Sequence, residues 1–528
     1  MVSPTPKAGE EVADVWADSP ERINDVFKPW SERSPGHPAL IEAAGTWSYG
    51  ELASMVAGAQ AWLVELGVRP GDRVMIVGEN CRAFVAILLA LTALDAWPVL
   101  VNARMSAREI DEIRDHCGAR RLVYTTSVSP HAREHAGRHG AVIAEAAELG
   151  PIGVGPSNEE VEPEPIDASA SSRVAALIYT SGTSGLPKGV MLTHGNLLFA
   201  ATGSAKIRAL TSDDRVYGVL PISHVAGLSV ALLGSLISGA TLYLSPRFDP
   251  AATFKALERD RVTVLLGAPA MYSLLVEYAK LKGWESLKSP ALRIISTAGA
   301  PLDAALKSSA ERLLGLVLQN AYGMTECSPN IAQTRIDAPR SDTSVGPVFP
   351  GVEVQLVGID GKPVAAGEVG EMWVRGPNVM KGYYRAPAET SAAVNAEGWF
   401  NTRDLARFED GNLFIAGRTK ELIVHFGFNV YPAEVEAVLN AHPGVARSAV
   451  IGRPARGTEG DEEVVAFVQP SPGSVLTAHD LAEHAARHLA AYKRPSQILL
   501  VATMPVTATG KIVKDELTKM AGRSAAVQ

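Results

Sequence analysis

Residues 73–124 read RVMIVGENCRAFVAILLALTALDAWPVLVNARMSAREIDEIRDHCGARRLVY, and this stretch alternates short apolar runs with segments of helix length. The alternation predicts βαβ units, because two parallel strands need a crossover between them and a helix is the usual crossover. Ser106, followed three positions later by Glu109, has the pattern of a capping box and predicts the start of a helix. The stretch therefore predicts a parallel sheet that is covered by helices.

A second alternation of the same kind begins at Arg173 and continues to Asn320. After Glu353 the pattern changes to short strands separated by turns, which predicts a β-rich subdomain. From Lys420 onward the pattern is that of a separate small α+β unit. The predicted fold class is α/β, with two parallel-type sheets and a β-rich subdomain in a large N-terminal domain. The expected bounds are 1–419 for that domain, about 345–419 for its β-rich subdomain and 420–528 for the C-terminal domain.

The two alternating stretches are joined by residues 151–172, PIGVGPSNEEVEPEPIDASASS. This segment is rich in proline, serine and acidic residues and has few apolar side chains to bury. Such a composition predicts a surface connection that packs little against the rest of the protein.

The composition is that of a soluble globular protein. The chain has 528 residues, too many for one ordinary domain, and its 20% charged and 47% hydrophobic residues exclude the disordered and fibrous classes. A formal net charge of −8 argues against nucleic acid and anionic membranes as partners. Three cysteines in so long a chain argue against a disulfide framework. The start lacks a secretory pattern and the longest apolar run, Phe84 to Leu94, is too short to span a membrane, so we expect a cytoplasmic protein.

The segment 179–194, YTSGTSGLPKGVMLTH, is the most informative for function. It follows an apolar strand, and its three glycines and four hydroxyl residues would surround a concave turn with hydrogen-bond donors, as a polyphosphate requires. Serine and glycine alone would fit a flexible surface loop, but the ordered string also carries Lys188. A P-loop is excluded, because Pro187 stands where its second glycine should be and Gly189 stands where Ser or Thr should follow the lysine.

This loop resembles the signature of the adenylate-forming superfamily, which includes acyl-CoA synthetases, nonribosomal peptide synthetase adenylation domains and luciferases. The resemblance covers about residues 24–517, with several motifs in the family's order. It implies ATP, Mg²⁺ and coenzyme A as ligands and a small carboxylic acid as substrate. It assigns a catalytic role to Thr183. The loop residues that it assigns to ATP are Thr180, Ser181, Gly182, Thr183, Ser184, Gly185 and Lys188.

A second signature, QNAYGMTE, occupies residues 319–326. Tyr322 offers a flat face for adenine, and Thr325 offers a hydroxyl near the phosphates. Glu326 offers a hard oxygen ligand for Mg²⁺, and we assign it a catalytic role. Taken alone, a Tyr-Gly turn with a glutamate is more often structural than functional. Its occurrence together with the phosphate loop favours the functional interpretation. Upstream, AGAPL at 298–302 resembles the segment that lines the adenine and acyl sites. The further residues assigned to ATP from these two segments are Gly299, Ala300, Pro301, Asn320, Ala321, Gly323 and Met324.

The segment NTRD, residues 401–404, stands where the family usually has a Thr-Gly-Asp triplet. The resemblance implies that Asp404 binds the ribose hydroxyls. Arg403 replaces the usual glycine, and if that turn needs a positive φ, the arginine strains it modestly. A solvent-facing Arg403 side chain is the alternative.

The string GRTKELIVHFGFNVYPAEVE, starting at Gly417, resembles the hinge between the family's two domains. By this resemblance Arg418 reaches the ribose or the phosphates and Lys420 takes the hinge position. The following loop would approach the pantetheine arm of coenzyme A. The loop residues assigned to that arm are His425, Phe426 and Gly427.

Near the C-terminus, PVTATGKIVKDEL matches the family's Thr-x-x-Gly-Lys pattern and ends that pattern on Lys511. A lone lysine in a polar loop is usually solvated. When a carboxylate attacks the α-phosphate, however, two anions must meet, and a fixed ammonium stabilises the developing charge. We therefore assign adenylation to Lys511, followed by a rotation of the small domain about Lys420 for the thiol step.

The acyl pocket is expected around His224, which matches the family's Pro-x-x-His segment, although an isolated histidine is as often structural. Cys327 follows Glu326 directly, but a nucleophile is not needed where adenylation already activates the acid. The residues assigned to the acyl pocket are His224, Val225, Gly227, Gly299, Tyr322 and Gly323.

The function predicted from these motifs is an AMP-forming carboxylic acid:CoA ligase. An adenylation enzyme that loads a carrier protein shares every ATP motif and is the main alternative, and a nucleotide-binding scaffold without activity is another. The sequence looks closest to fatty acyl and 4-coumarate-like ligases, and no basic residue stands out in 225–233 or 298–302 to pair a second carboxylate. We therefore expect an apolar aryl or medium-chain acid as substrate. A homodimer is possible because it is common in the family.

Overall fold

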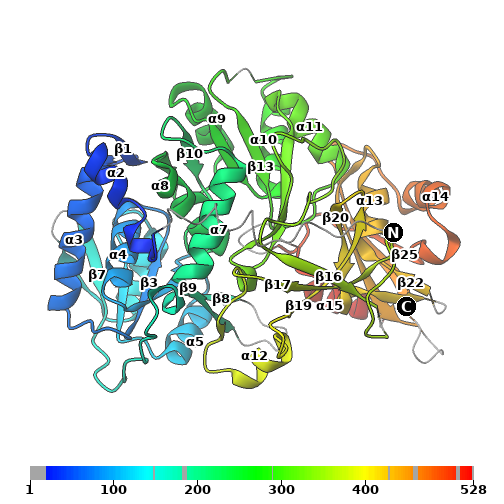
Figure 1. Cartoon of the computed structure of the whole chain (residues 1–528). Coiled ribbons are helices and arrows are strands. Elements are labelled where there is room, and N and C mark those ends of the chain that lie inside the picture. Colours follow the sequence, from blue (N-terminus) through cyan, green and yellow to red (C-terminus); the bar gives the residue numbers. More distant parts are fainter. Residues whose placement is uncertain are drawn as a thin grey trace.

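The fold was analysed in a computed structural model (Figure 1). It describes residues 20–146, 149–180, 187–287, 289–358, 360–425, 428–455, 462–506 and 512–525. Among these residues are two eight-stranded sheets, a four-stranded sheet and a small C-terminal domain. This arrangement confirms the predicted α/β class.

The first sheet is built from the stretch quoted above. Strands β3, β4, β5 and β8 run parallel, and antiparallel strands extend the sheet at both edges. In order across the sheet, its strands are β18 (Gly382–Tyr383), β9 (Lys188–Thr193), β8 (Val174–Thr180), β4 (Trp97–Asn102), β3 (Arg73–Gly78), β5 (Arg121–Tyr124), β7 (Pro151–Val154) and β6 (Val142–Glu145). Its helices are α3 (Tyr49–Glu65), α4 (Arg82–Ala93), α5 (Ala107–Cys117) and α6 (Pro130–Arg138).

Two local predictions for this region are confirmed. Helix α5 begins after Ser106, whose side chain caps the backbone of Glu109 while the Glu109 carboxylate accepts from Ser106. Helix α4, the apolar run of the sequence, is almost wholly buried. No helix in the described part of the chain is both long enough and apolar enough to cross a membrane.

The second eight-stranded sheet is parallel from β14 to β1, with antiparallel β15 and β2 at its edges. Its strands, in order, are β15 (Asn330–Gln333), β14 (Leu318–Gly323), β13 (Ile294–Thr297), β12 (Val264–Gly267), β10 (Arg215–Gly218), β11 (Thr241–Leu244), β1 (Pro38–Glu42) and β2 (Gly45–Ser48). Strand β1 precedes the whole first sheet in the chain, yet Leu40 pairs with Leu242 of β11.

One apolar core joins the two large sheets. It contains Val74 of β3, Leu242 of β11 and Leu197 of helix α7 (His194–Ile207). In Figure 1, α7 runs through the middle of the molecule, between β8 and β9 on one side and β10 and β13 on the other. The remaining helices of this region are α2 (Lys28–Arg33), α8 (Gly234–Ser238), α9 (Pro250–Arg259), α10 (Pro269–Leu281) and α11 (Ala304–Leu314), with the π-helical segment η4 (Ala226–Leu233) before α8.

The β-rich region is a four-stranded antiparallel sheet with α12 (Pro387–Ala393) beside it in the chain. Its strands are β16 (Glu353–Val357), β17 (Gly370–Arg375), β19 (Phe400–Glu409) and β20 (Asn412–Arg418). The short helix η6 (Thr419–Glu421) follows β20 and leads into the C-terminal domain.

The C-terminal domain has apolar cores of its own. In Figure 1 it lies at the right, from orange to red, beside the four-stranded sheet. Its elements are β21 (Ile423–His425), β22 (Phe428–Val430), α13 (Pro432–Asn440), β23 (Val445–Pro454), β24 (Glu462–Pro470), α14 (Ala478–His488), β25 (Gln497–Leu500) and α15 (Lys514–Ala525).

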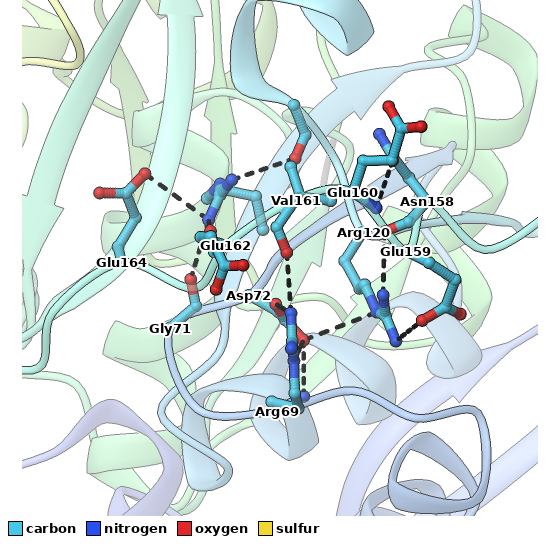
Figure 2. A network of polar contacts seen from close by, with 12 residues as sticks. Arg69, Gly71, Asp72, Arg120, Asn158, Glu159, Glu160, Val161, Glu162 and Glu164 are labelled. Atoms are coloured by element: carbon cyan, nitrogen blue, oxygen red, sulfur yellow. Dashed lines mark hydrogen bonds and ion pairs between the residues drawn. The ribbon is translucent and has the colours of Figure 1, made fainter.

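The prediction that 151–172 packs little is wrong. Its first residues form β7, which pairs with β5 and β6. The acidic stretch that follows is held by arginines of the first sheet and its approaches, as Figure 2 shows for Arg69 and Arg120. Arg69 donates to the carbonyl of Val161 at 2.9 Å, Arg73 to that of Glu162 at 2.7 Å, and Arg120 to that of Asn158 at 3.0 Å. Guanidinium groups thus satisfy a backbone that has little apolar surface to bury.

Candidate active site

Three predicted site residues from different strands meet at one point. The Tyr322 phenol, at the end of β14, donates a hydrogen bond to Asp404 of β19. Arg418, at the end of β20, lies opposite Asp404 in the ladder, and its Nε is 3.2 Å from Oδ1 of Asp404. The parallel sheet and the antiparallel sheet therefore contribute jointly to one polar site.

Burial keeps the Tyr322 phenol in its protonated form. Desolvation, and then the negative charge of Asp404, raise the pKa of the phenol well above its usual value. The phenol therefore stays neutral and serves as a donor. The side chain is nevertheless half-buried rather than fully covered. A partly exposed aromatic ring suits the stacking that was predicted for adenine.

A second group surrounds Glu326. Tyr383 donates its phenol hydrogen to Oε1 of Glu326 at 3.0 Å, and Nζ of Lys188 lies 5.0 Å from the centre of the Tyr383 ring. Burial raises the pKa of Glu326, although its own backbone N–H, Tyr383 and the charges of Lys188 and Arg418 oppose that shift. Lys188 and Glu326, both predicted from the sequence, are therefore brought to one place.

Glu326 fits the role predicted for it towards Mg²⁺. Its carboxylate is desolvated without full compensation by a positive charge, as the raised pKa indicates, and a divalent cation would supply that charge. In the described part of the chain no group of three or more His, Cys, Asp and Glu residues forms a metal cage. One carboxylate together with substrate phosphates is the arrangement that Mg²⁺ commonly uses.

Arg403 stands where the family usually has glycine, so the backbone conformation of the turn before Asp404 needs to be known. Arg403 has φ +59°, the left-handed region that favours glycine. Asn401 Oδ1 accepts from the Arg403 N–H at 2.9 Å, and Thr402 Oγ1 accepts from the Asp404 N–H at 3.1 Å. The Arg403 side chain is 65% exposed, 3.7 Å from Glu371. Both expectations hold together: the turn is strained, and the side chain faces solvent.

The glycines of the predicted site differ in what they do. Gly299 has φ +89° and a Cβ there would meet nothing within 4 Å, so its face is open, as a ligand contact requires. At Gly323 a Cβ would lie 1.8 Å from the Pro329 carbonyl oxygen, and at Gly227 it would lie 2.0 Å from that of Pro221. Packing alone therefore requires glycine at these two positions. Ala300 and Pro301 follow Gly299 after the carboxyl end of β13, where Ala300 is half-buried and Pro301 is exposed.

His224 lies at the surface, two residues before the π-helical segment η4. Its side chain is exposed, yet the surrounding protein desolvates the ring and lowers its pKa. Its Nδ1 accepts from the Ala226 N–H at 3.3 Å, at the start of the π-helical segment η4. Val225 beside it is buried. π-helical turns are rare and often occur at functional sites, which agrees with the predicted pocket-wall role.

The residues predicted for the hinge and the coenzyme A loop lie partly at the surface and partly in the interior. Lys420 in η6 is exposed. His425 is buried instead, with Nδ1 against the carbonyl of Glu462 on β24. Cys327 is buried and its pKa is raised well above the usual value by desolvation, so its thiol is not a nucleophile.

The remaining predicted residues in the nucleotide segments have defined places. Asn320 donates to the carbonyl of Thr343 at 3.0 Å, and Thr325 is buried in the short helix that carries Glu326. Thr180 ends β8, and Ala321 and Met324 are half-buried around Tyr322. The predicted residues that lie outside the described part of the chain are Ser181, Gly182, Thr183, Ser184, Gly185, Phe426, Gly427 and Lys511.

Tyr383 was missed from the sequence. It belongs to β18, a strand of two residues that pairs with β9 far away in the chain. No periodic pattern marks so short a strand. The signal that could have found it is the pair of adjacent tyrosines, Tyr383 and Tyr384.

Comparisons with known proteins agree with this geometry. Residues 27–384 match the family of AMP-binding enzymes, and residues 434–511 match the AMP-binding enzyme C-terminal domain. A feruloyl-CoA synthase of Amycolatopsis sp is 36% identical over 496 residues, covering 93% of this chain and 97% of the relative. A 3-[(3aS,4S,7aS)-7a-methyl-1,5-dioxo-octahydro-1H-inden-4-yl]propanoyl:CoA ligase of Mycobacterium tuberculosis is 34% identical, covering 92% and 96%. An anthranilate CoA ligase solved with anthranoyl-AMP has a TM-score of 0.85 and 25% identity, covering 97% and 99%.

Proposed function

The chain belongs to the family of AMP-binding enzymes and is an AMP-forming acyl-CoA synthetase, and we propose that it joins an apolar, ring-bearing carboxylic acid to coenzyme A. The observation that supports the ATP-dependent step is the meeting of Tyr322, Asp404 and Arg418 at the end of β14, and the names of the relatives support the ring-bearing acid. The feruloyl-CoA synthase and the indene-propanoyl ligase are named for ring acids, and the anthranilate ligase binds an aryl adenylate. A medium-chain fatty acid is the second substrate class that the sequence allows.

We assign the first step to attack of the acid's carboxylate oxygen on the α-phosphorus of ATP. A carbon-bound oxygen becomes joined to phosphorus, the bond from that phosphorus to the bridging oxygen breaks, and pyrophosphate leaves. Asp404 would accept from the ribose hydroxyls, Arg418 would neutralise phosphate or ribose oxygens, and Tyr322 would stack on adenine. Glu326 would hold Mg²⁺, which offsets the phosphate charge.

In the second step the sulfur of coenzyme A attacks the acyl carbon. The thiol loses its proton, the carbon–sulfur bond forms, and AMP leaves with the electron pair of the broken carbon–oxygen bond. Coupling to AMP makes this possible because a free carboxylate repels nucleophiles and has no adequate leaving group.

We further propose that the two steps use two orientations of the C-terminal domain. Its proposed bounds are 420–528, with Lys420 as the hinge and 1–419 as the N-terminal domain. Lys511 would face the site during adenylation, and Thr183 would contact the phosphates. A cytoplasmic location and a homodimer remain predictions from the sequence.

The carrier-protein alternative is not favoured, because the full-length relatives are named as CoA ligases. The deciding experiment incubates the purified protein with ATP, Mg²⁺, coenzyme A and a panel of aryl and fatty acids. Mass spectrometry should find aryl-CoA and AMP. Pyrophosphate release without any acyl-CoA would favour the carrier-protein reading, and no pyrophosphate with any acid would contradict both.

A further inference from the structure

Arg208 is a buried cation at the C-terminal end of α7. It is 5% exposed, and none of the described carboxylates forms an ion pair with it. Its Nη1 donates to the carbonyl of Ser204 at 3.3 Å and to the Ser204 hydroxyl. Its Nη2 lies 3.5 Å from the hydroxyl of Ser296, and its Nε has no acceptor among the described residues. Desolvation lowers the pKa of Arg208 to about 10, which still leaves it charged at neutral pH.

Two glutamines extend this polar group across the second sheet. Ser296 of β13 pairs with Gln319 of β14, so their side chains share one face of the sheet. Gln333 of β15 lies opposite Ala321, two positions after Gln319, and therefore belongs to the same face. Gln319 and Gln333 are 6% and 2% exposed, and within the described chain neither Oε1 has a donor.

Burying these polar groups costs free energy of folding unless hydrogen-bond or ion-pair partners compensate for it. An uncompensated buried charge is strongly unfavourable, and buried polar atoms without partners are rare. The C-terminal carbonyls of α7 offset part of the charge on Arg208. They leave the Arg208 Nε and the Oε1 atoms of the two glutamines without partners among the described residues, which is the condition expected of a site that a ligand completes.

The group borders the segments predicted to line the acyl site. Ser296 precedes Ala298 by two positions, and the open Gly299 follows at the carboxyl end of β13. Helix α7 packs against η4, which begins two residues after His224. Asn330 of β15 donates to the carbonyl of Ala200 at 3.1 Å and so fixes α7 against the same sheet.

We propose that Arg208, together with Gln319 and Gln333, binds an oxygen-bearing group at the far end of the acyl substrate, with Nε of Arg208 donating to its oxygen. The preferred acids would then carry a phenolic, carbonyl or carboxylate oxygen on the part of the ring most distant from the reacting carboxylate. This inference rests on the proposed function. The relative named for an indene-propanoyl substrate has two ring carbonyls in that name, and such oxygens are acceptors of the required kind.

The test compares three acids of matched shape: cinnamic, 4-hydroxycinnamic and 4-carboxycinnamic acid. The wild-type enzyme should convert at least one oxygenated acid with a kcat/KM about tenfold or more above that of cinnamic acid, because an unmade buried hydrogen bond to a charged group is costly. Preference for the hydroxyl or for the second carboxylate identifies which oxygen the group receives. A wild-type preference for unsubstituted cinnamic acid overturns the inference.

Arg208→Met should remove the preference, lowering kcat/KM for the oxygenated acid about tenfold or more while cinnamic acid changes less than about threefold. Lys206→Met, which deletes an exposed cation two residues earlier on α7, is the matched control and should leave the ranking unchanged. An equal loss with all three acids would mean that Arg208 only supports the fold. Should Arg208→Met fail to fold, the same comparison of acids with Arg208→Lys and with the wild type still tests the inference. Absence of any acyl-CoA from the wild type would instead contradict the proposed function.

Discussion

The Tyr322 phenol donates its hydrogen bond to Oδ2 of Asp404 and so joins β14 of the large parallel sheet to β19 of the antiparallel sheet. Arg418 approaches the other oxygen of the same carboxylate. Asp404 is thereby held in place from both sides before a nucleotide arrives. Preorganisation of this kind reduces the cost of ordering a binding site.

Tyr322→Phe should raise KM for ATP by roughly three- to tenfold, because the ring remains while the hydrogen bond that orients Asp404 is lost. The effect on kcat should be smaller. The measurement is ATP-dependent pyrophosphate exchange at saturating acid. An unchanged KM would mean that Asp404 is positioned without the phenol.

Glu326→Gln should separate stability from activity. Because burial raises the folded-state pKa of Glu326, its charged form destabilises the fold, and stability falls as pH rises through that raised pKa. The variant should therefore melt at a higher temperature than the wild type at pH 7, and the difference should shrink as pH falls towards the ordinary range of glutamate. Mg²⁺-dependent adenylation should fall by about 100-fold or more. A lower melting temperature at pH 7 would contradict this account.

Arg403→Gly should raise the free energy of unfolding, by up to about 1 kcal/mol, because glycine adopts φ +59° without the strain of a Cβ. The exposed ion pair between Arg403 and Glu371 contributes little to stability, so its loss offsets little of this gain. Urea denaturation measures the difference. Arg403→Val is the comparison, and it should be destabilised because a branched side chain tolerates this backbone poorly. Equal stability of the two variants would show that the turn is not strained.

Lys514→Met should destabilise the C-terminal domain by roughly 2–4 kcal/mol. Nζ of Lys514 lies 3.0 Å from Glu421 and 2.7 Å from Glu436, and the variant would leave these carboxylates facing each other. Burial lowers the pKa of Lys514, but the two glutamates outweigh it and raise the pKa overall. The stabilisation is thus complete at neutral pH and is lost only above the ordinary range of lysine. Hydrogen exchange in α13 and α15 would report the loss, and unchanged protection would refute it.

Lys511→Ala should lower pyrophosphate exchange by about 100-fold or more while sparing the reaction of coenzyme A with supplied acyl-adenylate. The charge of this lysine is needed only where two anions approach each other. Single-turnover assays of each half-reaction provide the measurement. An equal loss in both would contradict the two-orientation proposal.

The structural features that depend on local sequence pattern were predicted from the sequence. The period of 73–124 predicted β3, α4, β4 and α5, and Ser106 with Glu109 predicted a helix start, because such signals lie within a few residues of each other. Contacts between distant segments had no such signal. Tyr383 reaches Glu326 through a two-residue strand, and the acidic stretch after β7 is ordered by arginines more than thirty residues upstream.

Strand β1 has a consequence for how the chain is made. Its partner in the sheet, β11, is about two hundred residues further on, since Leu40 pairs with Leu242. During synthesis on the ribosome the second sheet cannot close until β11 has emerged, and every strand of the first sheet except β18 is translated in the interval. The apolar side chains of β1 therefore stay uncovered by β11 until that strand has been synthesised. A fragment ending before residue 241 would lack that neighbour altogether.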